Sequence, residues 1–101
     1  MAYEAGALDA TIAAAAGGDE ALYRELRKAF LESAERQLDL LRRSRCDGNW
    51  RIAAMRLKGL ASSFHDAELV ELGEEAVDCA PGEPGVLRRI AGHLETVARV
   101  I

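Results

Sequence analysis

Aromatic side chains make up only 5% of this 101-residue chain, and cysteine, histidine and proline each occur twice. The two cysteines form no CxxC pair and no histidine stands at zinc-ligand spacing, so we expect reduced thiols and no metal site. No apolar run approaches the roughly 20 residues needed to cross a bilayer. The net charge of −4 argues against nucleic-acid binding, because neutralising phosphates requires a surplus of basic residues. We therefore expect no metal, no cofactor, no membrane span and no nucleic-acid partner.

Half of the residues are apolar and 30% are charged, a balance typical of a globular domain. The length suits a single domain over residues 1–101, with no room for a second. The N-terminal stretch contains Glu4 and Asp9 and lacks a basic leader, so it does not resemble a signal peptide. We expect a cytoplasmic protein.

Turn residues divide the first half of the chain into helical segments. A short helix is expected around Leu8 and Ile12, followed by a turn at Gly17–Asp19 in which Asp19 caps the next helix. That long helix should run to about Arg45, with the turn at Cys46–Asn49. Its predicted apolar stripe recurs every three or four residues and comprises Leu22, Leu26, Phe30, Ala34, Leu38 and Leu41.

Three further helices follow. One should run from about Trp50 to about Phe64, and a junction at His65 and Asp66 leads into the next. Pro81–Gly85 is the strongest helix breaker in the sequence. The stripe of the fourth helix comprises Leu69, Leu72, Ala76 and Ala80, and that of the last comprises Leu87, Ile90, Ala91, Leu94, Val97, Ala98 and Ile101. With no strand pattern, these segments predict an all-α, up-and-down antiparallel four-helix bundle with a short N-terminal helix across one end.

Charges are segregated along the chain. Between residues 42 and 58 there are six basic residues against one acid, whereas residues 66–83 contain seven acids and no lysine or arginine. Solvated helix faces that partly neutralise one another would explain this pattern. A surface that attracts a partner with an acidic site is the functional interpretation.

The stretch AAMRLKGLASSF, residues 53–64, has an unusual outward face. At about 100° per residue, its buried arc comprises Ala53, Leu57, Leu60, Ala61 and Phe64. Met55 then lies opposite, and around it lie Ile52, Lys58, Gly59 and Ser62. An exposed mid-helix glycine costs about 1 kcal/mol relative to alanine. Its usual compensation is the close approach of another backbone, although a single glycine and an exposed methionine can also be neutral.

The run Met55–Gly59, with small residues after it, resembles the signature of histidine-containing phosphotransfer (HPt) domains, His-x-Leu-Lys-Gly. The resemblance extends over nearly the whole chain and includes Leu8, Asp9, Gly18, Asp19, Glu20, Phe30, Leu69, Leu72 and Glu75. It implies a four-helix bundle that binds receiver domains. It also implies that Lys58 lies beside a phosphoryl group and that Gly59 makes room for the receiver's active-site loop.

Two positions depart from the family pattern. Met55 stands where the family has the phosphoryl-carrying histidine, and a thioether cannot form a phosphoramidate. His65 stands where the family commonly has glycine.

We therefore expect a non-catalytic docking module of a two-component phosphorelay that binds a response-regulator receiver or a sensor histidine kinase. The expected contact residues are Ile52, Met55, Arg56, Lys58, Gly59 and Ser62, with Arg51 also facing the receiver's acidic pocket.

Two alternatives remain open. The first is an active phosphotransfer protein whose acceptor has moved to His65 or to His93 on the flank of the last stripe. The second is a bundle that self-associates through Ile52 and Met55, although we expect a monomer. Enzymatic chemistry is not expected, because Ser62 and Ser63 lack the context of a nucleophile elbow and no Glu-x-x-His pair is present.

Overall fold

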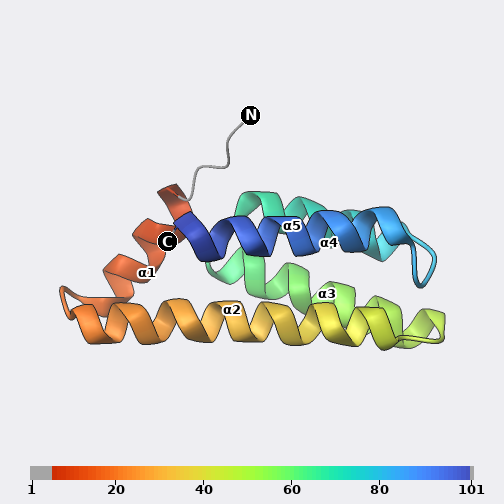
Figure 1. Cartoon of the computed structure of the whole chain (residues 1–101), viewed down its shortest axis with the longest axis horizontal. Coiled ribbons are helices and arrows are strands. Elements are labelled where there is room, and N and C mark those ends of the chain that lie inside the picture. Colours follow the sequence, from red (N-terminus) through yellow and green to blue (C-terminus); the bar gives the residue numbers. More distant parts are fainter. Residues whose placement is uncertain (1–5, 101) are drawn as a thin grey trace.

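The computed structural model describes residues 6–100, and within this range all regular structure is helical. The five helices are α1 (Gly6–Ala16), α2 (Glu20–Arg43), α3 (Asp47–Ser63), α4 (Ala67–Asp78) and α5 (Pro84–Val100). Figure 1 shows α2 as the longest element, with α1 at the end of the molecule where α5 finishes. None of the described helices combines the length and apolarity that spanning a membrane requires.

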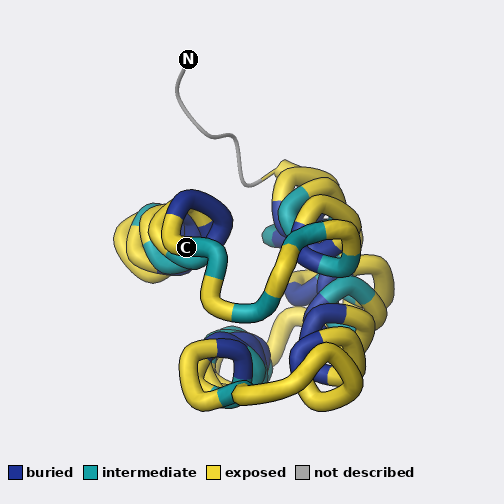
Figure 2. The backbone as a smooth tube through the Cα atoms, turned by 90° about the vertical axis from the view of Figure 1, so that its right-hand side faces the viewer, coloured by how far each residue is buried: buried dark blue, intermediate teal, exposed yellow. Residues whose placement is uncertain are grey.

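Helix contacts follow a closed cycle. α2 contacts α3 and α5, α4 contacts the same two helices, and α1 contacts α2. Buried residues of these helices face a common interior, as the end-on view in Figure 2 shows. The core includes Leu8, Ile12, Phe30, Ala34, Leu38, Leu41, Trp50, Ala53, Ala54, Leu57, Ala61, Leu69, Ala76, Val86, Ile90, Leu94 and Val97.

Side-chain caps define where α2 and α4 begin. The Asp19 carboxylate accepts a hydrogen bond from the Leu22 amide, which confirms the predicted cap. Asp66 caps α4 in the same way through the Leu69 amide. The predicted short first helix is also confirmed, with Leu8 and Ile12 buried.

The predicted turn at Cys46–Asn49 is wrong. α2 ends at Arg43, Ser44 is extended, and α3 already begins at Asp47. The Ser44 hydroxyl donates to the Leu40 carbonyl and so satisfies a free acceptor at the end of α2. Asp47 suits the first turn of α3, because a carboxylate is favoured at the positive end of the helix dipole.

The start of α5 also differs from the expected turn. Pro84 and Gly85 belong to the helix, since proline is tolerated in the first turn where no amide partner is lost. The Glu83 carboxylate accepts hydrogen bonds from the amides of Gly85 and Val86, which lowers the pKa of Glu83 below its ordinary value.

The predicted apolar stripes are correct in their centres and wrong at some ends. Leu22 is exposed, and Ala80 and Ala98 are exposed as well. Ile101 lies outside the described residues. Leu22 and Ala98 lie in the terminal turns of α2 and α5, and Ala80 lies beyond the end of α4.

α3 and α4 are joined by a specific hydrogen bond. The indole Nε1 of buried Trp50 donates to the Ala76 carbonyl at 2.7 Å. This bond connects the first turn of α3 to the last turn of α4. It therefore holds the two helices that carry the candidate site at a defined spacing.

Candidate functional site

Met55 lies on the exposed side of α3. The residue is 53% exposed and Ile52 is 51% exposed, both large values for apolar residues. Arg56, Gly59 and Ser62 are exposed as well, whereas Lys58 is half-buried. The inward side of the helix carries Trp50, Ala53, Ala54, Leu57 and Ala61.

This outward side is a ridge between two grooves. The groove between α3 and α4 has a volume of about 590 Å³. It is lined by Arg51, Met55, Lys58, Gly59, Ser62, Glu74, Val77 and Asp78. Four of the six residues predicted to contact a partner therefore line one groove.

The other two predicted contact residues, Ile52 and Arg56, line a separate groove between α2 and α3. Its remaining lining residues are Leu40, Arg43, Ser44, Asn49 and Ala53. The α2 contribution could not be found from the helical wheel of α3 alone. A partner that covers Met55 and Ile52 together must sit astride the α3 ridge.

An ion pair crosses the groove between α3 and α4. Lys58 Nζ lies 3.5 Å from Glu74 Oε1, and both side chains are about half exposed. Exposed pairs of this kind contribute roughly 0–1 kcal/mol, so a partner can displace Glu74 from Lys58 at little cost. The sequence did not identify Glu74, Val77 and Asp78 as part of this groove. Their spacing of three and four residues, in an acidic segment, was the signal that could have placed them on one face of a helix.

The two glycines of this region have different surroundings. A β-carbon at Gly59 would meet no atom within 4 Å, so packing within the described structure does not require this glycine. A β-carbon at Gly73 of α4 would come 2.9 Å from Lys58 Cβ and 3.0 Å from Lys58 Cα. Gly73 therefore allows α4 to approach the backbone of Lys58 closely. The sequence did not indicate this contact, because a glycine adds no apolar side chain to the predicted stripe of that helix.

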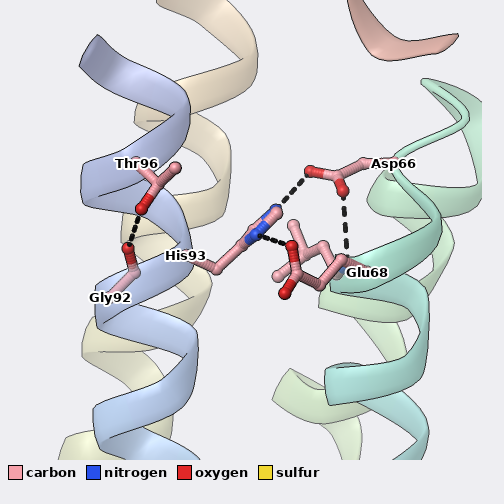
Figure 3. A network of polar contacts seen from close by, with 6 residues as sticks. Asp66, Glu68, Gly92, His93 and Thr96 are labelled. Atoms are coloured by element: carbon pink, nitrogen blue, oxygen red, sulfur yellow. Dashed lines mark hydrogen bonds and ion pairs between the residues drawn. The ribbon is translucent and has the colours of Figure 1, made fainter. Parts of the chain in front are cut away.

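His93, which the sequence places on the flank of the last apolar stripe, is 95% buried between α4 and α5. Figure 3 shows its ring held between two carboxylates. Its Nε2 lies 2.7 Å from Asp66 Oδ2, and its Nδ1 lies 3.0 Å from Glu68 Oε2. Its nitrogens are therefore engaged inside the protein.

His65 adopts a left-handed backbone conformation, with φ of 61°, directly after the C-terminal end of α3. This conformation normally favours glycine, which gives a physical reason for the glycine expected there by resemblance. The ring Nδ1 lies 2.9 Å from Thr11 Oγ1 of α1. His65 is exposed but does not line the groove that contains Met55.

Other reactive groups lie elsewhere. Cys46 and Cys79 are free thiols, and burial raises the pKa of Cys79. The Tyr23 hydroxyl of α2 donates a hydrogen bond to the Asp9 carboxylate of α1. This bond connects the two helices and raises the pKa of Tyr23. Within residues 6–100, no three His, Cys, Asp or Glu side chains are grouped so as to hold a metal ion.

Comparisons of the chain with models of known protein families, with curated proteins and with solved structures produced no match.

Proposed function

We propose that this chain is an HPt-like docking module of a two-component phosphorelay. It binds a response-regulator receiver domain or a sensor histidine kinase, and it carries no phosphoryl group itself. In this interpretation α2 to α5 form an up-and-down antiparallel four-helix bundle with α1 across one end, in agreement with their cyclic contacts. The module acts as a cytoplasmic monomer without enzymatic activity.

One observation carries the proposal: Met55, Lys58 and Gly59 line the same open groove, in the order of the HPt motif. An exposed thioether flanked by small residues can enter a complementary apolar surface. The open space above Gly59 permits another backbone to come close. Arg51 and Lys58 lie at the same groove and favour an acidic partner site.

The acceptor chemistry is absent at this groove. Met55 has no titratable nitrogen, and thioether sulfur is a weak hydrogen-bond acceptor. Attack on an aspartyl phosphate by His93 would require breaking its contacts with Asp66 and Glu68 and opening the interface between α4 and α5. The end of α3 lies about 12 Å along the helix axis from Met55, at 1.5 Å per residue, and His65 lies beyond that end.

A phosphotransfer and binding assay tests the proposal. Wild-type protein is mixed with a panel of phosphorylated receiver domains, and both label transfer and the lifetime of the receiver phosphate are followed. We expect no acid-labile label on the wild type, together with a Kd for at least one receiver or a changed rate of its dephosphorylation. Label on the wild type would contradict the proposal and assign the acceptor role to His65 or His93.

A pair of glycine variants locates the docking face. Gly59→Leu places a bulky side chain over the groove and should abolish receiver binding while the protein remains folded. Gly92→Leu on α5 is the matched control, because a β-carbon at Gly92 also meets nothing within 4 Å. Gly92 is exposed, and its helix α5 makes no contact with α3. Equal binding by both variants would contradict docking on α3. A mass that rises with concentration and falls in Gly59→Leu would instead support self-association through Ile52 and Met55.

A further inference from the structure

Charges of opposite sign that have no ion-pair partner lie around Met55. Arg51 and Arg56 of α3 and Asp78 of α4 form no ion pair with any described residue, although all three are exposed at the grooves. Other charges nearby are already neutralised, since Lys58 pairs with Glu74 and Arg43 with Asp39. Among the charged residues that line the two grooves, these three are therefore the ones available to a partner.

The basic and acidic residues at the two grooves lie on different helices. The charged residues that line the groove between α2 and α3 are both cations, Arg43 and Arg56. The other groove has Arg51 and Lys58 on its α3 wall and Glu74 and Asp78 on its α4 wall, and Glu74 pairs with Lys58. Glu75 of α4 pairs with Arg89 of α5 and does not line this groove. From α3 to α4, the charged residues that line the grooves therefore change from basic to acidic.

From this change of sign, we infer that a partner docks astride α3 in one orientation only. Its acidic cluster lies over Arg51 and Arg56, and a basic side chain beside that cluster pairs with Asp78. The inference rests on the proposed docking function and adds to it the chemistry and the direction of the partner. It predicts a receiver whose acidic pocket is bordered on one side by lysine or arginine.

A second copy of this chain fits the surface less well. Stable homodimer interfaces bury roughly 800 Å² or more per partner and are predominantly apolar at the centre. Here Ile52 and Met55 are the only large apolar residues exposed on α3 within the described structure, and charges surround them. Two apolar contacts within a charged border fit a transient complex with a different protein.

Asp78→Lys tests the orientation, because attraction by net charge and the proposed orientation predict opposite changes in the Kd for the receiver. If only net charge mattered, a more basic module would bind an acidic receiver more tightly. In the proposed orientation, a basic side chain of the partner faces the lysine introduced by Asp78→Lys. The two positive charges repel, so the Kd should rise about tenfold, and this loss of affinity should shrink in high salt. The change should not disturb folding, because Asp78 is the last residue of α4, where the helix dipole favours a cation.

Glu95→Lys is the matched control, with the same charge change at an exposed site on α5. Its Kd should stay within about twofold of the wild type, or fall slightly, because long-range attraction is screened beyond about 8 Å at physiological salt. Both variants are titrated with the receiver of the panel that binds the wild type most tightly, at 50 mM and 200 mM salt.

Rescue by the partner gives the direction directly. Basic residues that border the receiver's acidic pocket are changed to glutamate one at a time, and one such variant should restore tight binding to Asp78→Lys in a double-mutant cycle. Wild-type binding that is unchanged or tightened by Asp78→Lys overturns the orientation but leaves docking intact. Failure of the wild type to bind any receiver overturns the proposed function and the orientation together. A concentration-dependent mass that Asp78→Lys abolishes would assign the face to a second copy and also overturn the inference.

Discussion

Gly73 of α4 lies against the backbone of Lys58 of α3, so closely that a β-carbon at Gly73 would approach Lys58 Cα to 3.0 Å. The lysine of the HPt-like motif thus depends on a glycine from a different helix for its position. Gly59, one residue further along α3, has open space around it. Alanine substitutions at these two positions therefore test which glycine is required by helix packing.

Gly73→Ala should destabilise the protein and Gly59→Ala should stabilise it. At Gly73 the added methyl group forces α3 and α4 apart, at a cost of roughly 1–3 kcal/mol. At Gly59 the same change improves helix propensity by about 1 kcal/mol and meets no atom. Urea unfolding followed by circular dichroism measures both, and equal effects at the two sites would contradict the packing described here.

His93→Phe should lower the free energy of unfolding by about 3 kcal/mol, because it leaves the carboxylate of Asp66 buried without its ring partner. Glu68→Gln is the control. It removes a carboxylate from the same ring, but the Glu68 side chain is half exposed, so the loss should stay under about 1 kcal/mol. A His93→Phe protein as stable as the wild type would show that the network in Figure 3 contributes little.

Glu83→Gln should make the free energy of unfolding less dependent on pH in acid. The amides of Val86 and Gly85 lower the pKa of Glu83 in the folded state from an ordinary value of 4.5. The stabilisation is therefore complete above pH 4.5 and is lost as the pH falls through the lowered folded value. Urea unfolding between pH 6 and the acid limit of folding measures the slope. Glu95→Gln, at an exposed site without capping bonds, should keep the wild-type slope.

Met55→His should convert the module into a phosphate acceptor. The position is exposed and lies beside Lys58 in an open groove, so an imidazole there can reach a docked aspartyl phosphate. The ring nitrogen then attacks phosphorus, the bond to the aspartyl oxygen breaks, and the receiver regains its carboxylate. Acid-labile label on Met55→His, absent from Met55→Gln, is the expected result. A variant that binds the receiver and takes no label would exclude the Met55 position from the phosphoryl path.

The α3 surface illustrates how far single-helix reasoning extends. The wheel correctly separated exposed Met55 and Ile52 from buried Leu57, because burial of one helix face follows a 3.6-residue period. It could not show that Ile52 and Met55 line different grooves, because the walls come from α2 and α4. The stripe of α5 likewise placed His93 on its flank but could not show what the ring contacts. Its partners Asp66 and Glu68 lie more than 20 residues away in sequence.

By itself, the sequence determined the five helical segments, the cap at Asp19, the centres of the apolar stripes and the exposure of Met55. These properties depend on local propensity, capping and periodicity, which act within a few turns of one helix. Only the tertiary structure decided that Gly73 lies against Lys58, that Glu74 pairs with it and that His93 bridges two carboxylates. Each of these contacts joins different helices, and their register is decided by side-chain packing over the whole core.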